Sequence, residues 1–157
     1  MKKIDIVVPV QSVEYSELTA EQQRVVDEAR DATLRSYAPY SKFRVGAAIL
    51  LSDGSVVTGS NQENVAYPSG TCAERTACYY AGANHPEARF EKIAISARGT
   101  DGEEVSLPIP PCGACRQALL EYEKLAQHDV EVILVGRDSI YILPSVGSLL
   151  PLAFSEF

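Results

Sequence analysis

Two groups of cysteines constrain the fold of this chain more than any other feature of its sequence. Cys72 follows a polar loop, Cys112 and Cys115 follow a segment rich in Gly and Pro, and each group opens a stretch that predicts a helix. At a helix N-terminus the unpaired backbone N–H groups and the positive end of the dipole favour thiolate. Because Cys112 and Cys115 are three residues apart on one helix, both sulfurs can reach the same ion, and we expect the fold to bring Cys72 to them.

Cys78, the fourth cysteine, lies on the same predicted helix as Cys72. At a rise of 1.5 Å per residue, six residues of helix separate the two by about 9 Å along the axis. Two sulfurs that bind one zinc ion at about 2.3 Å cannot be that far apart, so we expect Cys78 to be a small buried hydrophobic residue. Three thiolate ligands with an open fourth position are typical of a catalytic zinc site. The Cys112–Cys115 pair alone is also compatible with a redox dithiol or with half of a structural zinc site.

The hydrophobic pattern and the turn signals predict an α/β chain. In chain order we expect an extended segment over Ile4–Val10, a helix that starts with a capping box at Thr19–Gln22 and ends before Pro39, strands over 44–51 and 56–58, a helix over 72–83, a strand over 92–97, a helix over 113–127, and strands over 130–135 and 140–143. This order predicts a three-layer α/β/α sandwich around a mixed five-stranded sheet. Right-handed crossovers place the two cysteine-bearing helices side by side on one face. We expect residues 1–157 to form a single domain, with 1–17 as an N-terminal extension.

Charge and hydropathy narrow the partners that we expect. A net charge of −7 argues against nucleic acid, because affinity for a polyanion comes largely from Lys and Arg. The apolar runs are too short to span a membrane, and the stretch at Ile4–Val10 is too short for a secretory signal, so we expect a cytoplasmic protein with reduced thiols. A small neutral molecule is the partner that we expect.

Glu74 and Arg75 lie in the first turn of the helix that Cys72 opens. The simplest interpretation of Glu74 is a carboxylate stabilised by the helix dipole, by about 0.5 kcal/mol. The alternative is a general acid and base that lies beside a metal ion without binding it, which a structural zinc site does not need. Three thiolates on a divalent cation leave a net negative charge, and a guanidinium that donates to the sulfurs offsets it. Arg75 or Arg116 could do this, and we favour Arg75.

The segments Cys72–Arg75 and Pro111–Gln117 together closely resemble the zinc-binding motifs of the cytidine deaminase family. The similarity also covers residues 39–47, 61–68 and 149–154, so it runs from about Leu18 to Phe154. It implies a homotetramer with one Zn2+ per subunit, bound by the three cysteines, and hydrolytic deamination of cytidine and deoxycytidine in pyrimidine salvage. Glu74 is then the residue that moves protons.

The resemblance also implies roles for residues outside the zinc motifs. In the family pattern the backbone of Ala73 holds the base, Asn61 and Glu63 bind the ribose, and Phe43 packs beside the pyrimidine. Asn64 and Tyr67 belong to the same substrate-binding segment, and Phe154 resembles a residue that extends into the site of a neighbouring subunit. Without the resemblance, Asn61 and Glu63 are typical turn residues and Phe43 is a typical core residue.

Two alternatives stay open at this point. One is a relative that acts on another aminopyrimidine such as blasticidin S, although the Asn61-x-Glu63 pair favours an ordinary ribose. The other is a non-enzymatic zinc-binding or redox module that uses Cys112 and Cys115. The family's polynucleotide and deoxycytidylate branches typically carry histidine at the position of Cys72, so a cysteine there favours the nucleoside branch.

Overall fold

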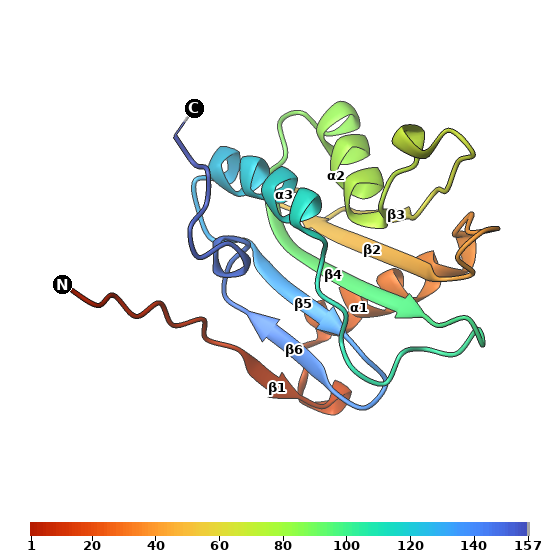
Figure 1. Cartoon of the computed structure of the whole chain (residues 1–157), viewed down its shortest axis with the longest axis horizontal. Coiled ribbons are helices and arrows are strands. Elements are labelled where there is room, and N and C mark those ends of the chain that lie inside the picture. The colour runs from red at the N-terminus through yellow and green to blue at the C-terminus, as the bar shows by residue number, and fades with distance from the viewer. Residues whose placement is uncertain (157) are drawn as a thin grey trace.

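A mixed six-stranded sheet forms the centre of the computed structural model, which describes residues 1–156 (Figure 1). Its order is β1-β6-β5-β4-β2-β3, and β4 and β5 pair in parallel while the other neighbouring strands pair antiparallel. The strands are β1 (Gln11–Val13), β2 (Arg44–Leu51), β3 (Val56–Ser60), β4 (Phe90–Arg98), β5 (Glu131–Val135) and β6 (Ile140–Leu143). The helices are α1 (Ala20–Ala32), α2 (Ala73–Asn84) and α3 (Gly113–Ala126), and short 3-10 turns cover 15–17, 33–35, 67–69 and 147–149.

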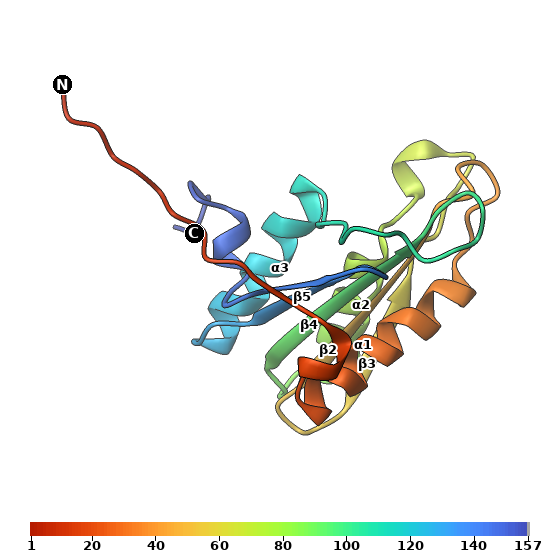
Figure 2. The same ribbon diagram turned by 90° about the horizontal axis from the view of Figure 1, so that it is seen from below.

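The helices form two layers, one on each face of the sheet (Figures 1 and 2). Alternate residues of β2 show this division, because Ala48 and Leu50 pack with α1 whereas Ala47 and Ile49 pack with α2 and α3. Strand side chains point alternately to opposite faces, so each face has its own apolar core. The predicted α/β/α sandwich is therefore confirmed, and α2 and α3 share a face as expected. Among the residues that the structure describes, no helix is both long enough and apolar enough to cross a membrane.

The expected strand count needs correction. The sheet has six strands and not five, because Gln11–Val13 pairs with Ile140–Ile142 at the edge of the sheet. The Ile4–Val10 segment is not part of the sheet. β6 has four residues, and three of them pair with residues of the N-terminal extension. The first helix ends at Ala32, followed by a 3-10 turn over 33–35, and so stops several residues before Pro39. The predicted ends of the later elements differ from the observed ends by at most two residues, and Cys72 is the N-cap of α2 and not its first residue.

Two glycines let the helices approach the sheet. A Cβ on Gly46 would lie 2.2 Å from the backbone oxygen of Ala29 in α1. A Cβ on Gly59 would lie 2.4 Å from the backbone nitrogen of Ala77 in α2 and 2.6 Å from the oxygen of Ala73. The crowding atoms are backbone atoms, so a side chain at either position forces a whole helix to move.

We therefore expect Gly59→Ala to destabilise the protein by about 3 kcal/mol, because α2 must shift away from β3. For a chain of this length that loss lowers the melting temperature by about 6 to 12 °C. Thermal unfolding followed by circular dichroism measures the effect. Gly113→Ala is the matched control, since a Cβ there meets no heavy atom within 4 Å. An equal effect of the two substitutions would contradict the close approach of α2 to the sheet.

Candidate metal centre and its cavity

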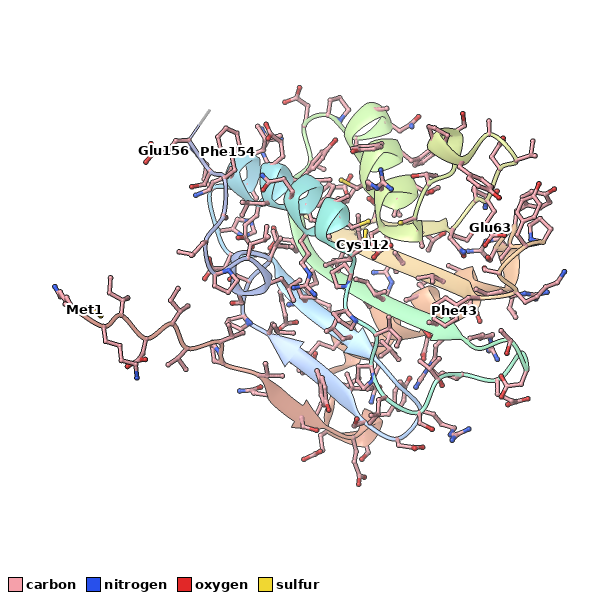
Figure 3. All side chains as sticks on the ribbon, in the orientation of Figure 1. Met1, Phe43, Glu63, Cys112, Phe154 and Glu156 are labelled. Atoms are coloured by element: carbon pink, nitrogen blue, oxygen red, sulfur yellow. The ribbon has the colours of Figure 1, made fainter. Side chains whose placement is uncertain are left out.

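Three cysteines meet where α2 and α3 begin. Cys72 is the N-cap of α2, Cys112 is the N-cap of α3, and Cys115 lies in the first turn of α3. Their three sulfur atoms lie within 4.8 Å of one another, and the Sγ atoms of Cys72 and Cys112 are 3.9 Å apart. Figure 3 shows sulfur atoms gathered beside the labelled Cys112. Among residues 1–156, these three cysteines are the side chains that the fold brings close enough together to hold one metal ion.

The donor set fits zinc. Zinc–sulfur bonds of 2.3 Å in a tetrahedron put neighbouring sulfurs about 3.8 Å apart, close to the spacing of Cys72 and Cys112. Thiolates are soft ligands that select zinc over magnesium or calcium. Cys78 takes no part in this group, and its side chain is fully buried in the core. Burial raises the pKa of the Cys78 thiol to about 12, so the prediction of a buried hydrophobic residue is confirmed.

The three sulfurs do not share charge equally when no metal is bound. Hydrogen bonding from Cys115 and from Arg75 lowers the pKa of Cys72 to about 5, and the same coupling raises the pKa of Cys115. Cys72 is therefore a thiolate at neutral pH, which is the form of cysteine that binds a metal cation. A metal bound by all three residues must displace the remaining thiol protons.

Arg75, and not Arg116, is the guanidinium beside the sulfurs. Nη2 of Arg75 donates to Sγ of Cys72 at 3.6 Å. Arg116 instead donates through Nε to the carbonyl oxygen of Pro111 at 2.8 Å and through Nη1 to that of Leu149 at 2.9 Å. Arg116 thus ties the backbone before Cys112 to the C-terminal segment, and sequence analysis missed this role.

Glu74 lies next to the sulfurs and is buried, with 4% of its surface exposed. Burial raises the pKa of its carboxyl, and the negative charge on Cys72 raises it further. A carboxyl whose pKa is raised towards neutrality is suited both to accept and to return a proton. Glu74 is not part of the group of atoms that could bind the metal, and its role as a general acid and base stays a prediction.

A cavity of about 620 Å³ opens beside Cys72, which is one of its lining residues. Its volume lies in the usual range for small-molecule sites. Six of its lining residues are predicted site residues, namely Asn61, Glu63, Asn64, Tyr67, Cys72 and Arg75. Tyr40 and Ser41 also line it, although sequence analysis did not single them out. The signal was present, because both residues lie in the 39–47 segment that resembles the family.

Asn61 organises the rim of this cavity. Its Oδ1 accepts hydrogen bonds from the backbone N–H of Val45 at 2.8 Å and from the hydroxyl of Ser36 at 2.5 Å. Its Nδ2 donates to the carbonyl oxygen of Phe43 at 3.0 Å. Asn61 therefore fixes the loop before β2 in addition to lining the cavity.

Glu63 also lines the cavity and also binds the backbone of the loop before β2. Its carboxylate accepts hydrogen bonds from the backbone N–H of Tyr40 at 2.8 Å and from the Ser41 hydroxyl. The bond from Ser41, joined by the backbone N–H donors, lowers the pKa of Glu63. Glu63 is thus an ionised acceptor at neutral pH.

Six predicted site residues are not among the cavity lining, namely Glu74, Cys112, Cys115, Phe43, Ala73 and Phe154. Phe43 is half-buried and lies at the start of β2, and the side chain of Ala73 is fully buried under α2. Phe154 is 69% exposed, and Figure 3 places it well away from Cys112. Its carbonyl oxygen accepts a hydrogen bond from Nε2 of Gln117 on α3 at 2.9 Å. The fold of one chain therefore does not bring Phe154 to the cysteines.

Comparisons with known proteins identify relatives in the family that the sequence motifs resemble. Residues 19–127 match the family model of the cytidine and deoxycytidylate deaminase zinc-binding region. A cytidine deaminase of Halalkalibacterium halodurans is 40% identical over 135 residues, which is 86% of this chain and 95% of the relative. A probable cytidine deaminase of Dictyostelium discoideum is 37% identical over 87% of this chain and 85% of its own. A crystal structure of cytidine deaminase from Burkholderia pseudomallei matches with a TM-score of 0.71 at 37% identity, and covers 87% of this chain and all of that one.

Proposed function

The chain belongs to the cytidine and deoxycytidylate deaminase family, and from this premise we propose that it converts cytidine and deoxycytidine to uridine and deoxyuridine by hydrolysis, with release of ammonia. The observation that carries the proposal is the buried Glu74 beside three converging sulfurs, of which that of Cys72 belongs to a residue lining an open cavity. A free nucleoside fits a cavity of this size. The reaction serves pyrimidine salvage.

Cys72, Cys112 and Cys115 hold one zinc ion per subunit. Zinc, when bound, supplies a Lewis acid that brings the pKa of a water ligand towards neutrality. Arg75 reduces the excess negative charge of the thiolates through its hydrogen bond to Cys72. Without that guanidinium, three anionic ligands would oppose the loss of a proton from water.

Glu74 carries the protons of the reaction. It accepts a proton from the attacking water and delivers it to N3 of the pyrimidine while the new C4–O bond forms. The same carboxyl then takes the second water proton and gives it to the amino group, which leaves as ammonia when the C4–N bond breaks. Each proton travels between neighbouring atoms, so one carboxyl with a raised pKa suffices for both transfers.

Residues of the cavity rim bind the nucleoside. Asn61 and the ionised Glu63 offer an amide and an acceptor to the ribose hydroxyls, in line with the bonding capacity of these groups. The backbone of Ala73 at the start of α2 holds the base. Phe43 packs beside the pyrimidine ring, which requires it to turn towards the cavity when substrate binds.

Asn64 and Tyr67 complete the rim on the loop that leads to Cys72. We assign residues 1–157 to one domain and place the protein in the cytoplasm. The exposed Phe154 does not line the cavity of its own chain, which supports the family arrangement in which this residue reaches the site of a neighbouring subunit. The assembly is then a homotetramer.

Purified zinc-loaded protein tests the activity directly. We expect absorbance near the cytosine maximum to fall when cytidine or deoxycytidine is added, and ammonia to appear in equal amount. Blasticidin S, which lacks an ordinary ribose for Asn61 and Glu63, should react far more slowly. The matched control is the same preparation stripped with a chelator and then restored with zinc. Stable absorbance in protein that contains one zinc per chain would overturn the proposal.

A further inference from the structure

The first ten residues form an extended arm that has no role in the site. This N-terminal arm, residues 1–10, projects away from the body of the molecule in both views (Figures 1 and 2). It leads into β1, whose three residues pair with β6 at the edge of the sheet. The apolar residues of the arm are exposed, namely Ile4, Ile6, Val7, Val8 and Val10.

Such large exposed fractions of neighbouring apolar side chains are unusual on the surface of a globular protein. Ile4 is 77% and Val7 is 84% exposed, and the five apolar residues lie within seven positions of one another. Contiguous apolar surface generally marks an interaction site. The arm is also an extension of an edge strand, and exposed edges are places where a second chain adds on.

A groove lies where the arm joins the sheet. It has a volume of about 320 Å³ and is lined by Pro9, Gln11, Glu131, Ile142 and Pro144. The arm itself contributes Pro9 to this groove. In a pair of copies related by a two-fold axis, the arm of each copy would lie in the groove of the other. Such a self-complementary contact is the usual form of a two-fold interface.

Charge also favours a second copy. The arm holds two of the 14 Lys and Arg residues and one of the 21 Asp and Glu residues, so its formal charge is +1 and the rest of the chain carries −8. A basic arm next to an acidic body of another copy gains electrostatic attraction. Pro9 has no N–H to donate, so side-chain packing in the groove, and not an unbroken ladder of hydrogen bonds, provides most of the contact.

We propose that the N-terminal arm is an interaction element that packs against a second copy of this chain, along the edge formed by β1 and β6. The apolar side chains of residues 4–10 fill the groove of the partner. This contact is separate from the one proposed for Phe154, and it does not depend on the proposed activity.

A photoreactive residue in the arm tests the contact. Benzoylphenylalanine replaces Ile6 in the full chain, and the zinc-loaded protein is irradiated alone and in the presence of an excess of tagged full-length chain without the photoreactive residue. The matched control carries benzoylphenylalanine in place of Leu107, an apolar residue that is 63% exposed in the loop before Cys112. Denaturing electrophoresis and peptide mapping then report which chains are joined and where.

We expect the Ile6 position to give several-fold more crosslinked dimer than the Leu107 position. The crosslinks should map near Ile142 and Pro144 and should also join the photoreactive chain to the tagged chain. Crosslinks within one chain, or equal yields at the two positions, would overturn the proposal. The same holds if the Ile6 position crosslinks to no protein but does crosslink to lipid when anionic vesicles are added, since the arm is then a membrane contact.

Discussion

Replacement of Glu74 with Gln is expected to lower kcat for cytidine by about 10²- to 10⁴-fold, the range that general acid–base catalysis contributes. The amide has almost the shape of the carboxyl but cannot take a proton from water or return it to N3 and the leaving amine. Because Glu74 is not one of the three sulfur ligands, the variant should keep one zinc per chain. Metal analysis and the absorbance assay on one preparation measure both quantities.

The matched control is Glu121→Gln, which changes an exposed carboxylate on α3. It should change neither kcat nor zinc content. A Glu74→Gln enzyme within ten-fold of the unmodified rate would show that another group moves the protons. Retained zinc together with retained activity would favour a different catalytic residue, whereas lost zinc would make Glu74 a ligand.

Glu74→Gln is expected to lower activity but to raise the stability of the zinc-free protein. Burial raises the pKa of Glu74, so the folded state binds its proton more tightly than the unfolded state does. The contribution of this proton to stability is complete below the pKa of the unfolded chain and is lost as the pH rises through the folded pKa. At neutral pH the buried carboxylate therefore destabilises the zinc-free fold, and Glu74→Gln should raise its melting temperature more at pH 7 than at pH 4. This readout is independent of catalysis.

The sequence was sufficient to predict the metal centre because each ligand is set by local structure. Cys72 and Cys112 each occupy a helix N-cap, and a loop-to-helix transition is visible in a sequence. The spacing of Cys112 and Cys115 fixes their common direction. Only the meeting of the two helices needed the topology of the sheet, and the alternation of helices and strands already predicted that.

The features that sequence analysis missed depend on contacts between distant segments. Asn61 bonds the backbone of Val45 and Phe43, which no local pattern of the 61–68 loop announces. The short β1 strand exists because β6 leaves an edge that can accept it. Arg116 has the sequence position of a sulfur partner, but the nearby carbonyl oxygens of Pro111 and Leu149 take its donors.

These misses have a shared physical cause. A hydrogen bond from a side chain to a remote carbonyl depends on where the backbone passes, and the identity of the remote residue leaves no trace in the sequence. Motif positions therefore give the chemistry of the site, while the loops that shape its cavity become visible only in the folded chain. The glycine contacts of α1 and α2 with the sheet belong to the second class as well.

A second large effect is expected from Cys115→Ser, which exchanges a fully buried sulfur for a hydroxyl. A serine hydroxyl is a hard, protonated group at neutral pH and a poor ligand for zinc beside thiolates. We expect zinc content after dialysis to fall by more than about ten-fold, as even the loss of groups that only support metal ligands costs about 10- to 100-fold in affinity. Deamination should then disappear, and added zinc should restore little of it.

Cys78→Ala provides the matched control, since Cys78 is also fully buried but lies outside the sulfur group. It should keep one zinc and full activity, with a loss of about 1 kcal/mol in stability for the removed sulfur. The pair of variants separates the two possible forms of the metal site. If Cys78→Ala lost the metal, Cys78 would be a fourth ligand, and a zinc ion closed by four cysteines leaves no position for water. If Cys115→Ser kept the metal, the fully buried sulfur of α3 would not be a ligand at all. Only the combination of zinc lost at position 115 and kept at position 78 is compatible with three sulfurs and one open position, on which the chemistry of Glu74 depends.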